Sequence, residues 1–222
     1  DMFPIEYVEY FGQVYSMYFK YNLKKTLKNT DMILYNSEQT KSTTEEFFPE
    51  AKSIANVNAY IISNPVKKQW DNKDDDYFLY VGNMEKRKGV DLLIKGYLQY
   101  KSRGGKKKLI LGGKMQEEEI NQIVRSAMML DEDITYLDYV THDKKHELYA
   151  SMSAFVFPSK AEGFGMPIIE VMRFKKPIIA SNLPIFDDNF YRMLRDPSEN
   201  EKEVNPRRIK IIGRINELLG KT

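Results

Sequence analysis

The sequence predicts an α/β fold in which helices cover both faces of a parallel sheet. From residue 77 to residue 182, short apolar runs alternate with segments whose apolar residues recur at helical spacing. The strand candidates are nearly continuous apolar runs, as expected for strands that are buried on both faces. With 42% hydrophobic and 30% charged residues, the composition is that of an ordinary globular protein and argues against disorder.

The first 65 residues predict a smaller, separate region. Aromatic residues at helical spacing predict a helix over 6–30, which ends in several lysines. A short strand is expected over 31–37, a serine-capped helix over 37–51, and a strand over 58–66 that Asn64-Pro65 ends. The polar segment 67–76 is the expected boundary, which gives domains of residues 1–65 and 66–222.

Beyond this boundary the elements alternate regularly. Five strands are expected, over 77–83, 107–113, 133–140, 153–159 and 176–182. Helices are expected between them, over 90–103, 115–130, 142–152 and 166–174. A sixth strand over 191–197 and a tail over 205–220 complete the pattern. Parallel strands with right-handed crossovers bind ligands beyond their carboxyl ends, so those ends are where a site is expected.

Bulk properties exclude several classes of function. The net charge of +2 gives no indication of a nucleic-acid partner. The chain contains no cysteine, which excludes disulfides and fits a reducing compartment, so we expect a cytoplasmic protein. No apolar run has the length of a membrane span, and the acidic start "DMFPIEYVEYFG" is not a signal peptide. Because this start also lacks an initiator methionine, the chain is expected to be a fragment.

The loop after the first of the five strands carries two neighbouring cations, Arg87 and Lys88. Two adjacent cations at a strand's carboxyl end suit a diphosphate, and the planar guanidinium of arginine matches phosphate oxygens. The alternative is a solvated basic turn, which is common in proteins.

The stretch "FPSKAEGFGMPIIEVM" (157–172) follows the fourth strand and places a glutamate on each side of a glycine-rich turn. Gly163 and Gly165 allow a ligand to approach the backbone, and the helix expected to start near Met166 directs free N–H groups to the same place. Glu170, early in that helix, is suited to a vicinal diol such as a ribose. Glu162, on the other side of the turn, then faces the chemical group that is attached to the ligand's phosphates. The alternative makes Glu170 a helix-capping acid and Glu162 a surface loop residue.

Five segments follow one another along the chain: "YVGNMEKRKGVDLLIKGY", "LILGG", "ITYLDYV", "AFVFPSKAEGFGMPIIEVM" and "KPIIASN". In this order they resemble the donor-binding half of retaining glycosyltransferases with the GT-B fold, specifically family 4. "EGFGMPIIE" is similar to that family's Glu-x7-Glu signature. The resemblance covers roughly residues 58–222 and implies a Rossmann-like donor domain. Residues 1–65 resemble the end of the family's acceptor-side domain.

The resemblance implies a transfer of a sugar, in particular a hexose, from a nucleoside-diphosphate sugar to a glycan or lipid-linked acceptor with retention of configuration. Arg87 and Lys88 would neutralise the diphosphate, Glu170 would bind the ribose, and Glu162 would contact the transferred sugar in the catalytic role. Further donor contacts would come from the backbone at Gly82, Tyr139, Val140, Gly163, Phe164, Gly165 and Met166. No metal and no other cofactor is expected, since fixed cations can stabilise the leaving diphosphate.

The sequence departs from the family pattern in composition and in length. Asn83 stands where many relatives have arginine, Asp138 where they often have glycine, and Lys175 replaces the usual glycine before the fifth strand. Compared with the length that the resemblance leads us to expect, most of an acceptor-side domain is expected to be absent from this chain. Either the chain is an excised, inactive piece, or a partner chain supplies the rest of the acceptor-side domain. The alternative function for the chain is that of a non-catalytic subunit that binds a nucleotide sugar or a partner.

Other signals in the sequence carry less weight. The acidic runs 74–76 and 131–133 precede strands instead of ending them, so they do not indicate a metal site. His142 and His146 lack a third ligand and are expected on a solvated helix face. The aromatic residues of 3–21 suit a core or an interdomain surface; with the lysines that follow, they alternatively indicate peripheral contact with the inner face of a membrane.

Overall fold

The computed structural model describes residues 1–58, 73–183 and 185 of the chain. It divides the protein into two compact units. The first unit comprises the described parts of residues 1–62, 161–165 and 183–200, and the second comprises those of 63–160, 166–182 and 201–222. The expected sixth strand over 191–197 and the tail over 205–220 lie outside the described residues.

The first unit contains a small parallel sheet with helices. Strand β1 (Met32–Tyr35) pairs in parallel with β2 (Ala55–Asn58), with Leu34 opposite Val57. Between them lie α4 (Glu38–Phe47) and a 3-10 turn, η1 (Pro49–Ser53). The side chain of Ser37 accepts a hydrogen bond from the Thr40 N–H at 3.1 Å, which confirms the expected serine cap of α4.

Two expectations for this unit were wrong in their boundaries. The single helix expected over 6–30 is instead three helices, α1 (Phe3–Glu6), α2 (Val8–Phe11) and α3 (Gln13–Leu27). Gly12, with a φ of 81°, ends α2 and precedes α3, because this left-handed conformation cannot continue a right-handed helix. The strand expected from residue 58 begins earlier, at Ala55, and the rest of 59–66 lies outside the described residues.

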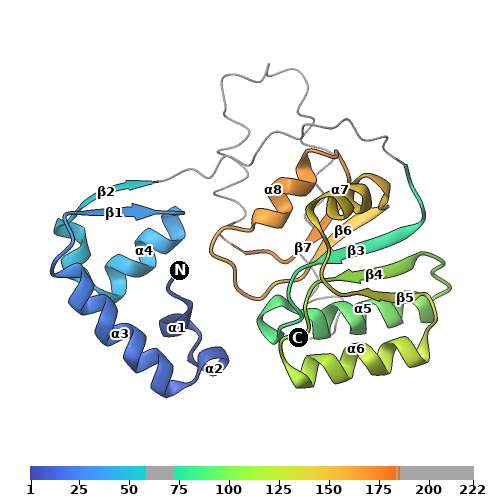
Figure 1. Ribbon diagram of the computed structural model, residues 1–222, viewed down its shortest axis with the longest axis horizontal. Coiled ribbons are helices and arrows are strands. Elements are labelled where there is room, and N and C mark those ends of the chain that lie inside the picture. The colour runs from blue at the N-terminus through green and yellow to red at the C-terminus, as the bar shows by residue number, and fades with distance from the viewer. Residues whose placement is uncertain (59–72, 184, 186–222) are drawn as a thin grey trace, which may run out of the picture. The chain divides into compact units, whose positions relative to one another are not determined.

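The second unit contains a five-stranded parallel sheet with the order β5-β4-β3-β6-β7. The strands are β3 (Tyr77–Val81), β4 (Lys108–Gly112), β5 (Ile134–Leu137), β6 (Ala154–Phe157) and β7 (Ile178–Ala180). Helices α5 (Val90–Ser102) and α6 (Glu118–Leu130) cover one face, and α7 (His142–Ser151) and α8 (Met166–Met172) cover the other (Figure 1). The predicted α/β class, a parallel sheet with helices on both faces, is confirmed.

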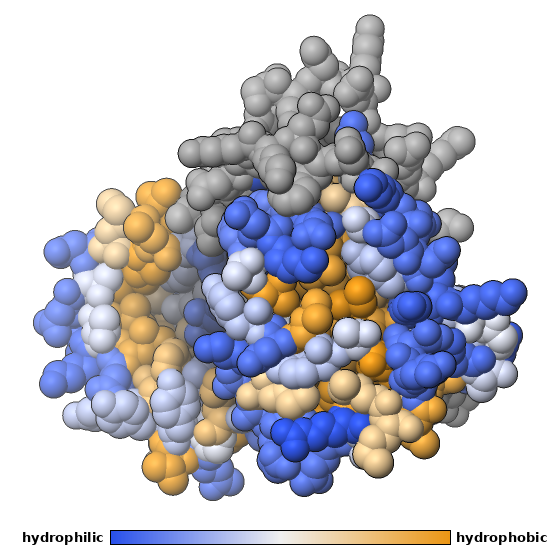
Figure 2. All heavy atoms as spheres, turned by 45° about the vertical axis from the view of Figure 1, so that its right-hand side comes forward, coloured by the Kyte–Doolittle hydropathy of each residue, from blue (hydrophilic) through white to orange (hydrophobic). Residues whose placement is uncertain are grey.

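Burial follows the apolar pattern that predicted the strands. All four residues of β6 are buried, and β3 carries buried residues on both faces, as expected for interior strands. The core beneath α5 and α6 includes Tyr80, Leu111 and Val124, each with no exposed area. Large hydrophobic side chains also reach the surface, where Figure 2 shows them in patches among polar ones. Among the residues that the structure describes, the most exposed of these are Val14, Met17, Leu130 and Met129.

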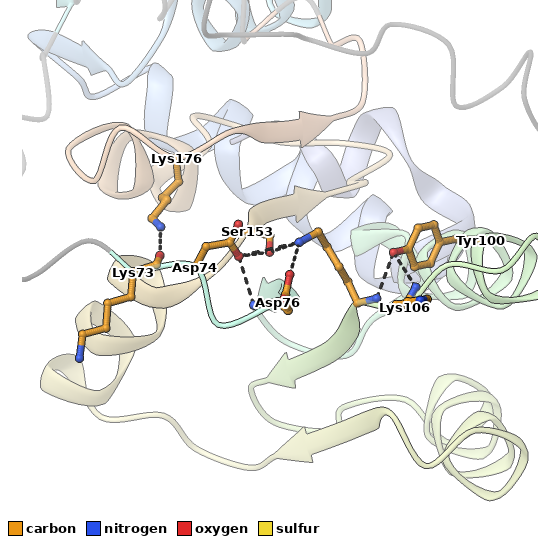
Figure 3. Close-up of polar contacts among 8 residues, drawn as sticks. Lys73, Asp74, Asp76, Tyr100, Lys106, Ser153 and Lys176 are labelled. Atoms are coloured by element: carbon orange, nitrogen blue, oxygen red, sulfur yellow. Dashed lines mark hydrogen bonds and ion pairs between the residues drawn. The ribbon is translucent and has the colours of Figure 1, made fainter.

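At the amino ends of the strands, a polar cluster joins the segment before β3 to β4 and β6 (Figure 3). The Lys107 ammonium contacts Asp76 at 2.6 Å and donates to the Ser153 hydroxyl at 2.9 Å, and Ser153 donates to Asp74. Hydrogen bonding from Ser153 holds the pKa of the Asp74 carboxyl below its usual range. The acidic run 74–76 therefore belongs to the end of the sheet opposite the expected site.

The strand order creates a switch point between β3 and β6. The chain runs from β3 outward through β4 to β5, and then returns to the other side of β3 to form β6 and β7. Crossovers therefore leave β3 and β6 in opposite directions, which opens a crevice at their carboxyl ends. The loops that follow these two strands hold the residues that the sequence singled out.

Candidate functional site

The loop after β3 carries Arg87 and Lys88 within a 3-10 turn, η2 (Lys86–Lys88), which Gly89 ends. The Arg87 guanidinium pairs with the Glu85 carboxylate at 3.1 Å and is only 15% exposed. The ammonium of Lys88 lies 5.9 Å from the centre of the Phe157 ring, at the carboxyl end of β6. Both cations are thus partly buried, which does not fit a freely solvated basic turn, and Lys88 extends towards the carboxyl end of β6.

This loop packs directly against the segment that follows β6. The Lys160 N–H donates to the Arg87 carbonyl at 2.8 Å. Gly89 has a φ of 69°, and a Cβ atom there would lie 2.0 Å from the Pro158 carbonyl oxygen. Only glycine allows so close an approach in this conformation. The sequence therefore brings the loops after β3 and β6 together through backbone contacts.

Close packing also limits side-chain size at the carboxyl ends of the neighbouring strands. A residue larger than glycine at position 82 would place its Cβ atom 2.9 Å from the Tyr80 hydroxyl. A Cβ at Gly112 would lie 2.8 Å from Val140, which follows β5. The Tyr139 ring is 71% exposed, and the Lys114 ammonium lies 6.0 Å from its centre. The loops after β3, β4 and β5 thus meet at one edge and present a flat ring at the surface.

Glu170 lies on α8, and its carboxylate contacts two side chains of α7. The Lys145 ammonium lies 2.8 Å from Oε2, and the Tyr149 hydroxyl donates to the same oxygen at 3.2 Å. The Glu170 side chain is 22% exposed and that of Lys145 is 19% exposed. Within the described part of the chain, the other oxygen, Oε1, takes part in neither of these contacts and accepts no hydrogen bond. Glu170 is therefore a fixed carboxylate with one oxygen left for a ligand.

The helix that carries Glu170 is short. As expected, α8 begins at Met166 with Pro167 in its first turn, but it has only seven residues. Its amino end alone is a weak argument for anion binding, because the helix dipole grows with the number of aligned peptides. The cations Arg87 and Lys88 are the stronger evidence for an anionic ligand.

The remaining candidates belong to the first unit. Gly163 is buried, Glu162 and Phe164 are half-buried, and Gly165 has a φ of 82°. Glu162 and Gly163 line a cavity of about 130 Å³. Polar side chains of the same unit share this lining, namely Glu6, Gln39, Thr40 and Thr43. Apolar side chains, among them Met2, Phe3 and Ile185, line the same cavity, so polar and apolar groups surround it together.

The structure therefore groups the predicted residues in two sets. Arg87, Lys88, Gly82, Tyr139, Val140, Met166 and Glu170 lie in the second unit, and Glu162, Gly163, Phe164 and Gly165 lie in the first. Their roles remain predictions. In the described parts of the chain, histidine, aspartate and glutamate side chains form no group of three or more that could hold a metal ion.

Sequence reasoning missed the side chains that support these residues. Lys145 and Tyr149 are four residues apart and so share a face of α7, but nothing in the sequence indicated that this face meets Glu170. No pattern in the sequence predicted a contact for Lys160 either. In the structure its ammonium contacts both carboxylate oxygens of Asp91, at 3.0 and 2.9 Å.

The family-model description "Glycosyl transferases group 1" matches residues 63–190, more than half of the chain. The chain belongs to this glycosyltransferase family. The match begins before β3, includes both loops at the switch point, and extends past β7. The resemblance given by the strand-end motifs is thereby confirmed.

Among curated relatives, the O-antigen chain mannosyltransferase RfbU of Salmonella typhimurium is 27% identical over 191 residues, which cover 85% of this chain and 52% of the relative. The chain thus spans about half the length of that protein. Two solved structures share the fold. Sucrose-phosphate synthase from Thermosynechococcus elongatus aligns with a TM-score of 0.60 and 22% identity, over 75% of this chain and 44% of its own. HepE from Anabaena, solved in complex with UDP and glucose, aligns with a TM-score of 0.58 and 15% identity, over 91% and 58%.

Proposed function

We propose that this chain forms the donor-binding part of a glycosyltransferase that moves a hexose from a nucleoside-diphosphate sugar to a glycan or lipid-linked acceptor. The observation that carries the proposal is that one unit, with its switch point between β3 and β6, holds Arg87 and Lys88 in the loop after β3 and the fixed carboxylate of Glu170 on α8. Two cations and a diol-binding acid are the groups that a nucleoside diphosphate requires.

Each part of the donor's nucleotide has a proposed counterpart in the second unit. Arg87 and Lys88 contact the diphosphate, and the free oxygen of Glu170 accepts hydrogen bonds from the ribose hydroxyls. The backbone near Tyr139 and Val140 lines the base. Because two fixed cations offset the charge that develops on the leaving diphosphate, the reaction needs no metal ion.

The transfer proceeds with retention of configuration. The acceptor hydroxyl attacks the anomeric carbon on the face that the diphosphate leaves. The bond from that carbon to the phosphate oxygen breaks, the bond to the acceptor oxygen forms, and a phosphate oxygen takes the acceptor's proton. Glu162 positions the sugar and stabilises positive charge on its ring.

The biological setting follows from the relatives. RfbU is named as an O-antigen chain mannosyltransferase, which supports a hexose donor and the synthesis of a surface polysaccharide. The HepE structure contains UDP and glucose, which supports a nucleoside-diphosphate sugar as donor. Such synthesis draws on nucleotide sugars in the cytoplasm, where we place the protein.

Calorimetric titration of this chain with UDP, GDP and ADP tests the donor proposal. Each titration is run once with Mg²⁺ and once with a chelator. We expect saturable binding of at least one nucleotide, with equal affinity in both conditions. No saturable binding of any of the three would overturn the proposed function, and binding that requires Mg²⁺ would overturn the metal-independent mechanism.

The second candidate is a non-catalytic nucleotide-sugar-binding or partner subunit. It is favoured by an uncovered apolar face on the two-stranded sheet, where Met32 is 56%, Leu34 67% and Val57 50% exposed. Parallel sheets are normally covered on both faces, so this candidate has a partner chain whose strands and helices cover this one. Donor binding that still gives no sugar transfer after an acceptor-side segment or a partner chain is added favours this candidate, and transfer under those conditions excludes it.

We also propose that α3 contacts an anionic membrane surface. Its residues Val14, Met17, Tyr18 and Tyr21 form an exposed apolar stripe at helical spacing, and Lys24 and Lys25 follow. Among the described helices, none combines the length and apolar character needed to cross a membrane. Cosedimentation with phosphatidylglycerol vesicles, but not with phosphatidylcholine vesicles, is expected. Equal recovery with Tyr18→Asp would refute this contact.

A further inference from the structure

The two side chains of α7 that contact Glu170 suggest a role beyond linking two helices. Lys145 and Tyr149 both reach Oε2 of the same carboxylate, at 2.8 and 3.2 Å. A carboxylate on one side of a helix can rotate about its last bonds, and two donors on one oxygen remove that freedom. The second oxygen, Oε1, is then held in one direction.

The Tyr149 ring is itself fixed, so its hydroxyl cannot move away from Glu170. The residue is fully buried. Its ring packs edge-on against Phe155 of β6, with centroids 5.6 Å apart and planes at 90°, and lies equally far from Phe174. Burial, and then the negative charge of Glu170, raise the pKa of the Tyr149 hydroxyl well above its ordinary value. The hydroxyl therefore stays protonated and remains a donor.

Lys145 adds a charge effect to this orientation. A carboxylate beside an anionic ligand repels it, and the repulsion is large where the site is partly buried. The Lys145 ammonium, only 19% exposed, offsets the charge of Glu170 without occupying Oε1. Its neighbour Lys144 contacts Glu147 at 3.0 Å instead, on the exposed side of the helix.

We propose that Lys145 and Tyr149 are positioning residues that aim Oε1 of Glu170 at the ribose hydroxyls of the donor nucleotide and lower the charge cost of binding it. This inference rests on the proposed function. It adds that recognition of the ribose depends on two side chains of α7 that contact Glu170. The competing explanation is that the contacts serve only to hold α7 against α8.

The test uses this chain, the nucleoside diphosphate that binds best, and its 2′,3′-dideoxy analogue. The wild-type chain is expected to prefer the ribonucleotide, because only it offers hydroxyls to Glu170. Tyr149→Phe keeps the ring and removes the hydroxyl, and we expect it to lower ribonucleotide affinity about 3- to 10-fold while leaving dideoxynucleotide affinity unchanged. Lys145→Met is expected to lower ribonucleotide affinity at least as much, and Lys145→Arg to restore most of it.

Matched controls separate positioning from support of the fold. Lys144→Met removes a lysine one residue away, and Tyr97→Phe removes a buried hydroxyl that donates to the Lys107 carbonyl at 3.1 Å. Both controls should keep the wild-type ratio of the two affinities. If Tyr149→Phe and Lys145→Met also keep this ratio, the inference is wrong and the contacts only support the fold. If the wild type binds no nucleoside diphosphate, the proposed function itself fails.

Discussion

Lys160 contacts both carboxylate oxygens of Asp91, at 3.0 and 2.9 Å, and so joins the segment after β6 to the first turn of α5. Both side chains are less than a third exposed. Together with the backbone contact between Lys160 and Arg87, this pair holds the two loops of the switch point against each other. The cations Arg87 and Lys88 are placed by these contacts as well as by their own strand.

Asp91→Asn is expected to lower the free energy of unfolding by about 1–2 kcal/mol, because it leaves the partly buried ammonium of Lys160 without its charged partner. Urea denaturation measures this change. A double-mutant cycle with Lys160→Met isolates the pair from the favourable effect of Asp91 on the dipole of α5. The control is Glu119→Gln, which breaks an exposed pair with Lys86 and should cost less than about 0.5 kcal/mol. A coupling energy near zero would show that the pair does not hold the loops.

Gly89→Ala is expected to destabilise the protein by more than about 2 kcal/mol, since it combines a left-handed backbone with a Cβ atom 2.0 Å from the Pro158 oxygen. Gly96→Ala is the matched control. Gly96 lies within α5 with no atom within 4 Å of its would-be Cβ, so alanine there should stabilise by about 0.5–1 kcal/mol. The melting temperatures of the Gly89→Ala and Gly96→Ala variants, measured by thermal unfolding, test both expectations. Similar melting temperatures would contradict the close approach of the two loops.

Much of the second unit could be predicted because its elements obey local rules. Buried parallel strands require apolar runs, and the helices between them show their own period, so each strand from β3 to β7 and each helix from α5 to α8 was expected close to its place. The side chains that hold Glu170 and Arg87 could not be predicted. Tyr149 and Lys160 act across elements that only the tertiary fold brings together, and a single sequence carries no record of such pairs.

The failures in the first unit have a different cause. The aromatic residues of 6–30 suggested one helix, but the chain breaks at Tyr7 and at Gly12, whose positive φ costs glycine nothing. A lone glycine within a helical pattern is often tolerated, so the pattern could not decide between a continuous helix and a break.

Lys175→Gly is expected to stabilise the protein by up to about 1 kcal/mol. Lys175 follows α8 with a φ of 53°, a conformation that strains a residue with a Cβ atom and that glycine adopts freely. The gain is limited because glycine also makes the unfolded chain more flexible. Chemical denaturation measures it. Lys144→Gly, in the first turn of α7, should instead destabilise by up to about 1 kcal/mol. A loss of stability at Lys175 as well would show that the strain at Lys175 is negligible.

Stability is expected to fall as the pH drops below about 6.5, in part because of His146. Burial, followed by the nearby His142 and Lys145, lowers the pKa of the His146 imidazole below its ordinary value of 6.5. The unfolded chain therefore binds more protons than the folded one between these two values, and the stabilisation present above pH 6.5 is lost as the pH falls. His146→Gln should flatten the dependence of the urea midpoint on pH between 7 and 5. An unchanged slope would refute this contribution.

The last prediction separates the roles of the two glutamates. Glu170→Ala should weaken nucleoside-diphosphate binding by this chain about tenfold or more, because it removes a charged acceptor of the ribose hydroxyls. Glu162→Ala should leave that binding unchanged, since the proposed function gives Glu162 a contact with the transferred sugar and none with the nucleotide. In the complete enzyme, Glu162→Ala should nevertheless abolish sugar transfer. Titration with the nucleotide measures the first effect and transfer of labelled sugar the second. Equal losses of nucleotide affinity in both variants would contradict this division, because the sugar-facing carboxylate has no reason to contact a nucleotide that carries no sugar.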